Sequence, residues 1–401
     1  MKIALITLHT PTETNFRGAS ALPFHLIAFR PQSIELEIWS YNINECNKAQ
    51  IVETENALGL KIHLIGIPKW FKTLKSAFIR LILSKPILYY LPLPKNTINE
   101  IKSYLHNDKP ALWIYGEDIA HISNHFEGLP IVITTPDCEA MYYHRVLAMK
   151  GIPQNIISTA RYALMYHRYA KTSAYAPSSN NITYHLVGKE DTRFLENLNP
   201  TVKAVYLPHP HYTPTLLPKA ELKKHERIRL LIAGRYDFTM ALASDDAVKA
   251  LSVLPQEIKD RYHITFLGQG WDICLKKIKE AGFTAEHKTF VKEYAEEIAS
   301  HHIQLTPISV GTGTKGKVLD AFINGLLVIG TPLALENIEA KHGEECVKYI
   351  NSDELSQWLT HFAIDPMSIN KIAKAGQMAV LREHSREKIA SELFKLFEYH
   401  S

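Results

Sequence analysis

The sequence has few cysteines and no long apolar run. Its cysteines are far apart and form no C-x-x-C pair: Cys46, Cys138, Cys274 and Cys346. Neither a zinc site of that type nor a redox motif is therefore predicted, and a reducing, cytoplasmic setting is expected. No stretch approaches the ~20 consecutive apolar residues of a membrane span. The opening MKIALITLHT favours a first buried strand over a signal peptide.

The chain also lacks a strong excess of one charge. Its 45 Lys and Arg against 41 Asp and Glu give a formal charge of +4, which is less than a dedicated nucleic-acid binder usually carries. The 20 histidines are scattered, and no pair of them has the spacing and third ligand of a metal site. No D-x-D pair stands out either. We therefore expect neither a nucleic-acid partner nor a bound metal.

The length of 401 residues suggests two domains. Strand and helix patterns alternate twice, and a proline-rich stretch at 208–226 separates the two series. We therefore predict an α/β protein with two Rossmann-like domains, 1–207 and 227–385, that face a central cleft. A last amphipathic helix occupies 386–401. His209 and His211, within the proline-rich stretch, are interpreted as hinge and cleft residues, because no third metal ligand accompanies them.

The most informative stretch is Ile303 to Gly330, IQLTPISVGTGTKGKVLDAFINGLLVIG. It predicts a short strand, a glycine-rich turn, a helix from about Lys315, and a second strand from Leu327. The turn consists of Gly311, Thr312, Gly313 and Thr314. Glycines there allow backbone N–H groups to approach a ligand closely, and the positive end of the helix dipole favours an anion.

Charged residues at the start of the same helix favour a phosphate as that anion. Lys315 and Lys317 add positive charge at its start, and Asp320 lies one to two turns further, within reach of a sugar hydroxyl. A nucleotide is therefore the predicted ligand. The alternative is an ordinary βα turn without a ligand. A nicotinamide dehydrogenase is disfavoured, because TLHTPTETNFRG follows the first strand in place of G-x-G-x-x-G.

The pattern P-x3-G-x-G-T-K-x-K-x-L-D-A-F-x-x-G-x-x-V-I-G-T resembles the donor-binding segment of GT-B glycosyltransferases, which include the family 4 (group 1) enzymes. In that family two acidic residues stand eight apart, the first near the donor sugar and the second on the ribose. Asp320 matches the second, whereas Thr312 occupies the place of the first. Arg235, after the strand Ile228 to Ala233, matches a family cation that binds the diphosphate. The resemblance implies a nucleotide-diphosphate sugar as donor substrate, retention and a last helix that crosses back to the first domain.

In the first domain, polar residues follow two predicted strands, 111–115 and 131–135. Gly116, Glu117 and Asp118 follow one; Asp137, Glu139 and His144 follow the other. The second segment resembles a loop of sugar transferases that begins with an acidic residue near the acceptor. Asp137 is the best catalytic candidate in this domain, with His144 behind it. Asp137 is equally explained as the cap of the helix that follows.

Two further segments carry weaker predictions. Arg17 and Gly18 lie in the loop after the first strand and resemble the family's cleft loop, but a plain surface loop explains them equally well. Residues 69–85 alternate aromatic and apolar side chains with lysines, as an amphipathic helix on an anionic membrane would. A core-facing helix with solvated lysines is the alternative. Ser173 to Ser178 is predicted as a strand.

The sequence therefore predicts a metal-independent glycosyltransferase. Its donor would be a nucleotide sugar, and its acceptor a glycan or a lipid-linked sugar, handled in the cytoplasm or at the inner membrane face. Two alternatives stay open: a nucleotide-sugar-binding protein without transferase activity, which Thr312 favours, and a sugar-nucleotide epimerase of the same fold.

Overall fold

The computed structural model describes residues 1–13, 18–75, 80, 82–106, 109–149, 155–212 and 221–398. They form two compact units. The first unit contains Met1–Ala148, residues 155–210 and the C-terminal segment from Arg386. The second unit contains Met149 and His211–Ser385.

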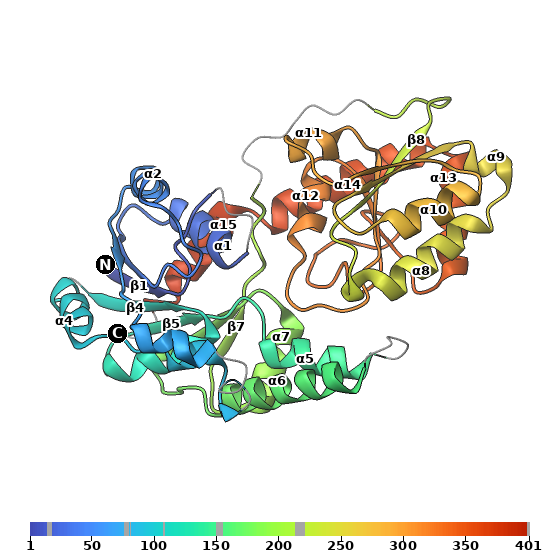
Figure 1. Ribbon diagram of the computed structural model, residues 1–401. Helices are drawn as coiled ribbons and strands as arrows, with labels where there is room; N and C mark the ends of the chain where they lie inside the picture. Colours follow the sequence, from blue (N-terminus) through green and yellow to red (C-terminus); the bar gives the residue numbers. More distant parts are fainter. Residues whose placement is uncertain are drawn as a thin grey trace. The chain divides into compact units, whose positions relative to one another are not determined.

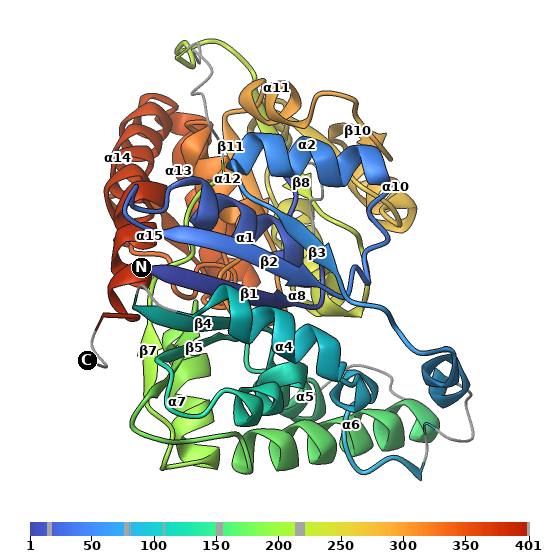
Figure 2. The ribbon, with the colours of Figure 1, turned by 90° about the vertical axis from the view of Figure 1, so that its left-hand side faces the viewer.

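The described strands of the first unit form a seven-stranded parallel sheet in the order β3-β2-β1-β4-β5-β6-β7 (Figure 2). These strands are β1 (Lys2–Thr7), β2 (Glu35–Ser40), β3 (Ile62–Leu64), β4 (Pro110–Tyr115), β5 (Ile131–Thr134), β6 (Ile182–Leu186) and β7 (Ala204–Tyr206). The helices are α1 (Gly18–Ala28), α2 (Lys48–Leu58), α4 (Lys95–Tyr104), α5 (Glu139–Ala148), α6 (Ile156–Ala174), α7 (Lys189–Leu198) and α15 (Arg386–Lys395). Three 3₁₀ helices are η1 (Lys69–Lys75), η2 (Ile87–Tyr90) and η3 (Glu117–His125).

The second unit, yellow to orange-red in Figure 1, contains a six-stranded parallel sheet in the order β10-β9-β8-β11-β12-β13. Its strands are β8 (Ile228–Ala233), β9 (Tyr262–Leu267), β10 (Thr284–Lys288), β11 (Ile303–Thr306), β12 (Leu327–Gly330) and β13 (Val347–Lys348). Its helices are α8 (Phe238–Ser252), α9 (Gln256–Lys259), α10 (Asp272–Glu280), α11 (Tyr294–Ala299), α12 (Gly316–Ile323), α13 (Ser352–Ile364) and α14 (Met367–Glu383). The prediction of two parallel-sheet α/β domains is confirmed.

The central strands are apolar because helices cover both faces of each sheet. All residues of β11 and β12 are buried, as are five of the six in β1. Each strand order reverses once, between β1 and β4 in the first sheet and between β8 and β11 in the second. Open α/β sheets bind ligands at such a switch point, beyond the carboxyl ends of the strands. In the second sheet, the predicted donor residues follow these two strands.

The last helix, α15, belongs to the first unit. Its Phe394 packs edge to face on Trp113 of β4, with ring centroids 5.8 Å apart, and Phe397 lies 6.3 Å from the same ring. The Arg386 guanidinium lies 4.6 Å from the centre of the Phe29 ring, just beyond α1. Figure 1 shows α15, in red, beside α1, in blue. The predicted return of the C-terminal helix to the first domain is confirmed.

Two predicted elements differ in the structure. The predicted helix at 69–85 is a 3₁₀ helix, η1, over its first seven residues; Pro86 lies immediately before the next one, η2. Proline restricts the residue before it to extended conformations, which favours a break there. Residues 173–178, predicted as a strand, contain the end of α6, and the strand lies later, at β6. Among the described helices, none combines the length and apolar character needed to cross a membrane.

Gly376 of α14 provides a test of packing in the second unit. A Cβ there would collide with the carbonyl oxygen of Glu345 and lie 2.8 Å from Cε1 of Phe322. We expect Gly376→Ala to lower the free energy of unfolding by about 1–3 kcal/mol, because overpacking outweighs the ~1 kcal/mol that alanine gains in a helix. Gly316→Ala, also helical but with open space around the added Cβ, should not destabilise the unit. Denaturant titration of both variants measures this difference, and equal stabilities would contradict the packing argument.

Candidate functional site

Two loops meet at the switch point of the second sheet. The loop after β8 leads into α8, and the loop after β11 leads into α12. The N–H groups of Ser309 and Val310 both donate to the carbonyl oxygen of Thr239, at 2.8 and 3.2 Å. The Ser309 hydroxyl accepts from the N–H of Ala243 at 2.9 Å. These bonds hold the loop after β11 against the first turns of α8.

A third loop, after β9, packs against the first. Gly268 has φ +122°, and a Cβ there would collide with the carbonyl oxygen of Gly234. The same oxygen accepts a hydrogen bond from the Trp271 indole at 2.7 Å, and the Tyr236 N–H donates to Gln269 O at 2.8 Å. This close approach requires glycine, because any side chain would push the turns apart. It fixes the backbone from which Arg235 projects.

The glycine turn and α12 form as predicted. α12 starts at Gly316, and its N-cap residue, Lys315, forms no side-chain cap. By contrast, Asp237 caps α8 through the N–H of Thr239 at 2.9 Å. Within the described chain, the first N–H groups of α12 thus have no capping carboxylate or hydroxyl from the N-cap residue, which leaves the positive end of the helix without that compensation.

The two lysines of the turn have different environments. Lys315 turns back into the protein: its Nζ donates to the carbonyl oxygens of Thr312 and Gly313 at 3.0 and 2.9 Å and pairs with Glu336 at 3.7 Å. Lys317 keeps much of its side chain exposed, and its Nζ lies 3.5 Å from the position that a Cβ would take at Gly234. Lys317 is therefore the lysine directed toward the Gly234 turn.

Arg235 follows that turn with an exposed side chain. Within the described part of the chain it forms no hydrogen bond or ion pair. Partial burial of the ammonium lowers the pKa of Lys317, whereas Asp320 and Asp237 act in the opposite direction. Two cations, one just after β8 and one in the first turn of α12, are thus placed near one backbone turn, a combination suited to a diphosphate.

Asp320 lies on α12, beyond the turn. Burial raises the pKa of its carboxyl to about 7, and Lys317 acts to lower it. Burial raises the pKa of Tyr294, at the start of α11, and the charge of Asp320 adds to that shift. A partly buried carboxyl between α11 and α12 can accept two hydrogen bonds from a vicinal diol, such as that of ribose.

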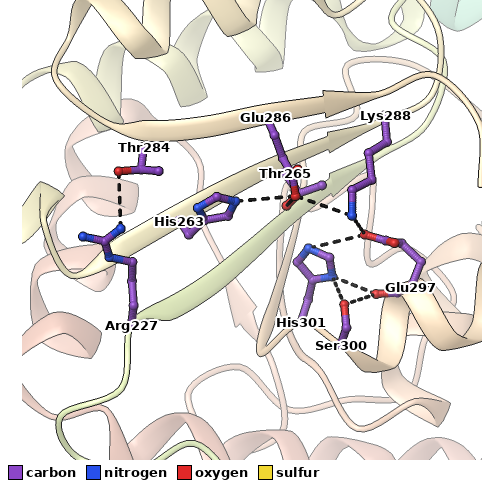
Figure 3. A network of polar contacts seen from close by, with 9 residues as sticks. All are labelled: Arg227, His263, Thr265, Thr284, Glu286, Lys288, Glu297, Ser300 and His301. Carbon is purple, nitrogen blue, oxygen red and sulfur yellow. Dashed lines mark hydrogen bonds and ion pairs between the residues drawn. The ribbon is translucent and has the colours of Figure 1, made fainter.

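The loop after β10 is fixed at both ends by a polar network (Figure 3). Lys288, the last residue of β10, binds Glu297 of α11 at 2.8 Å and Glu286 at 3.5 Å. His301 adds a 4.0 Å contact to Glu297. Between these anchors, Phe290 is 84% exposed.

In the first unit, carboxyl groups gather at the ends of β4 and β5. Burial raises the pKa of Glu117 to about 8, and those of Asp118 and Glu139 to about 7. Glu117 accepts a short hydrogen bond from the Ser173 hydroxyl and lines a cavity of about 20 Å³, room for about one water. Neither Glu117 Oε2 nor Asp118 Oδ1 has a hydrogen-bond partner within the described residues.

The structure does not group the two predicted catalytic residues of this unit. Asp137 is half-buried just before α5. His144 is exposed, and its ring lies 5.7 Å from that of Tyr166 in α6 and 5.5 Å from that of Phe194 in α7. It stands about 8 Å along α5 from the first residue of the helix. Its neighbours are thus helix side chains, whereas Asp137 lies near the strand ends.

Comparison with known proteins agrees with this architecture. Residues 246–395 match a family model described as glycosyl transferase-like. Similar solved structures include HepE of Anabaena in complex with UDP (10% identity, TM-score 0.61, 100% of both chains covered). Sucrose-phosphate synthase from Thermosynechococcus elongatus shares 12% identity, with a TM-score of 0.64 over 99% of this chain and 98% of that one. A glycosyltransferase from Rickettsia africae shares 11%, with a TM-score of 0.60 over 100% and 98%. No curated protein sequence matches.

The chain has the GT-B fold. The predicted resemblance to GT-B glycosyltransferases and the predicted enzyme class, a glycosyltransferase, are confirmed.

Of the remaining predicted site residues, the structure describes Thr312 and Gly18 but not Arg17. Thr312 is part of the turn and offers its carbonyl oxygen to Lys315. Gly18 is the first residue of α1, and Arg17 lies outside the described residues. Within the part of the chain that the structure describes, no group of three His, Cys, Asp or Glu side chains could hold a metal ion.

Some site residues were missed by sequence reasoning. Asp191 of α7 is fully buried and accepts from the N–H of Cys138 at 2.8 Å, at the start of α5. Glu336 and Asn337, after β12, contact the glycine turn through Lys315 and Gly313. No local motif marks these three residues, because each acts on a segment that is distant in the chain.

The carboxyl cluster predicts a pH-dependent stability. Burial raises the folded-state pKa of Glu117 to about 8, from an ordinary value of 4.5. Between these values the folded state binds more protons than the unfolded state. Stability should therefore fall as pH rises toward 8, by up to about 1.4 kcal/mol per pH unit for each proton so linked, and level off above it.

Glu117→Gln, which keeps the shape of the side chain, should flatten this pH dependence. The measurement is the unfolding free energy of the parent and the variant from pH 5 to 9. Glu127→Gln, at an exposed position of the same unit, is the control and should keep the parent slope. An unchanged slope in Glu117→Gln would show that this carboxyl does not titrate as stated.

Proposed function

We propose that the protein transfers a sugar from a nucleotide-diphosphate sugar to a glycan or lipid-linked acceptor. The observation that carries the proposal is the position of two cations, Arg235 and Lys317, beside the Gly234 turn and the start of α12. Departure of a nucleoside diphosphate leaves negative charge on its phosphate oxygens. Preorganised cations and N–H groups stabilise that charge more in the transition state than in the ground state.

The other donor contacts follow from the same geometry. The diphosphate lies against the N–H groups of the glycine turn, and the Asp320 carboxylate accepts from the ribose hydroxyls. Support also comes from HepE of Anabaena, whose structures contain UDP, UDP with glucose, and UDP-glucose. With cations supplied by the protein, the leaving group does not require a metal, and metal-independent transfer is part of the proposal.

A ligand screen tests the donor assignment. UDP, GDP, ADP and their sugars should include at least one that raises the unfolding temperature, because a ligand that binds only the folded state stabilises it by mass action. The ligand identified in this way then serves in titrations with the variants. If none of them binds, the nucleotide-sugar proposal is wrong.

Asp320→Asn should weaken binding of the identified nucleoside diphosphate ~10- to 100-fold, the loss expected for hydrogen bonds to a charged group. Because the carboxyl pKa is raised to about 7, parent affinity should also fall as pH drops below 7. The variant should lack that pH dependence. Isothermal titration between pH 6 and 8 measures both effects, with Asp353→Asn, exposed at the start of α13, as the control. Equal affinities of parent and Asp320→Asn would remove the ribose assignment.

For the acceptor, the proposal assigns Asp137 of the first unit. Its place beyond the carboxyl end of β5 is one where α/β sheets bind ligands, and His144 is a secondary candidate. Retention is proposed from the family resemblance, with a phosphate oxygen of the leaving group receiving the acceptor proton and Asp137 orienting the acceptor. In an inverting reaction, Asp137 would itself be the general base.

Asp137→Asn should lower kcat by at least ~10-fold, with a smaller change in the KM for the donor, because the residue acts on the acceptor. Steady-state transfer assays separate the two constants, and anomeric analysis of the product distinguishes retention from inversion. Glu196→Gln, exposed on α7, is the control. Parent-like turnover in Asp137→Asn would exclude the residue from the reaction.

One observation favours a second candidate, a nucleotide-sugar-binding protein without transferase activity. Thr312 occupies the position of an acidic residue in the related family, and its carbonyl oxygen is bound to Lys315. Such a protein would bind the donor identified by the screen yet transfer no sugar to any acceptor. An epimerase would convert the donor without an acceptor. Product analysis with and without acceptor separates the three activities.

Contact with a membrane remains a proposal for residues 69–85. In the described part of this segment, Trp70 and Ile82 are 51% and 71% exposed, and Lys69 and Arg80 add positive charge beside them. Exposed apolar groups combined with cations favour an anionic lipid surface. Co-sedimentation with vesicles that contain or lack anionic lipid measures this contact.

A further inference from the structure

The loop that follows β12 supports the glycine turn from behind. Thr331 donates its hydroxyl hydrogen to the carbonyl oxygen of Ile308 at 2.8 Å, before the turn. Further along, Asn337 Nδ2 donates to the carbonyl oxygen of Gly313 at 3.2 Å. Glu336 lies between these residues in the chain and pairs with Lys315. One loop thus contacts the turn segment at three separate points.

Lys315 and Glu336 form a shielded ion pair. Their side chains are only 11% and 14% exposed, so solvent screens the pair weakly. The Lys315 ammonium also holds the carbonyl oxygens of Thr312 and Gly313, at 3.0 and 2.9 Å. Its charge is therefore compensated inside the protein by a carboxylate and two carbonyl dipoles.

This arrangement sets the direction of the turn's peptide groups. In a planar trans peptide, the N–H points away from the C=O. With the Thr312 and Gly313 carbonyls held toward Lys315, the N–H groups of Gly313 and Thr314 point to the other side of the turn. Successive N–H groups with a common direction form the concavity that binds anions in many proteins.

The backbone of Asn337 adds a second sign of constraint. It has φ +62°, a left-handed conformation that few residues other than glycine adopt, although asparagine tolerates it. The residue is nearly buried, and this conformation accompanies the bond from its amide to Gly313. Strained backbone of this kind persists where the surrounding structure holds it, and such positions concentrate at ligand sites.

We infer that Glu336 and Asn337 are positioning residues for the donor phosphates, acting through Lys315 and Gly313 to orient the N–H groups of the glycine turn. The inference rests on the proposed nucleotide-sugar function. It assigns Lys315 to the shape of the turn, and leaves Arg235 and Lys317 as the side-chain cations for the phosphates. Neither positioning residue needs to touch the ligand.

Asn337→Gly tests the amide contact without disturbing the backbone. Glycine accepts the positive φ without strain, so the unfolding temperature should not fall substantially, but the bond to Gly313 is lost. We expect binding of the nucleoside diphosphate identified by the screen to weaken about 5- to 10-fold, as for one lost hydrogen bond. The KM for the sugar donor should rise by a similar factor, and kcat should change less.

The double variant Lys315→Met with Glu336→Gln tests the ion pair. It removes one positive and one negative charge, so the net charge beside the turn is unchanged. A loss of affinity then reports the geometry of the turn rather than Coulomb attraction. We expect about 10-fold weaker binding. The matched control is Lys276→Met with Glu280→Gln, an exposed pair on α10 at 3.9 Å, which should bind like the parent.

The outcomes distinguish the positioning role of Glu336 and Asn337 from the proposed nucleotide-sugar function. If the parent binds a nucleoside diphosphate and both Asn337→Gly and the double variant bind it equally well, the positioning role is wrong while the proposed function stands. If the parent binds none of the panel, the proposed function fails and the inference fails with it. Should the double variant not fold, Asn337→Gly still decides the positioning role.

Discussion

The close approach of two backbone turns determines the geometry of the donor-side residues. Gly268 lies so near the carbonyl oxygen of Gly234 that no side chain fits between them, and the Trp271 indole binds the same oxygen. This contact fixes the direction in which the chain leaves β8. Arg235 follows β8 and Lys317 lies in the first turn of α12, and the contacts between these two segments fix the spacing of the backbone that carries the two cations. The electrostatics of the site therefore depend on a rigid backbone.

The second constraint is the distribution of charge around the glycine turn. Lys315 and Lys317 are two residues apart in the chain, yet their side chains have different partners. Lys315 is neutralised by Glu336 and by carbonyl groups, whereas Lys317 is directed toward the Gly234 turn. Of the two lysines that the sequence pattern offers to a phosphate, Lys315 is therefore engaged inside the protein, and Lys317 is the one left for the proposed donor. Counting basic residues overestimates the positive charge available to a bound anion.

The sequence predicted those features that depend on local pattern. The parallel strands, the turn before α12 and the start of that helix at Gly316 follow from apolar periodicity and glycine placement. Contacts between distant segments were not predictable. Asp191 binds the N–H of Cys138, 53 residues away, and Asn337 binds Gly313, 24 residues away. In the first domain, the sequence indicated acidic residues at the strand ends, but their burial and raised pKa values depend on how the folded chain covers these strand ends.

The return of α15 to the first unit has a consequence for how the chain is made. Trp113, at the centre of the first sheet, packs against Phe394 and Phe397, which the ribosome delivers almost three hundred residues later. During synthesis, the second unit has all of its residues before the first unit can close its core. The first unit is therefore synthesised first but completed last. Until α15 has been made, the apolar surface around Trp113 stays exposed.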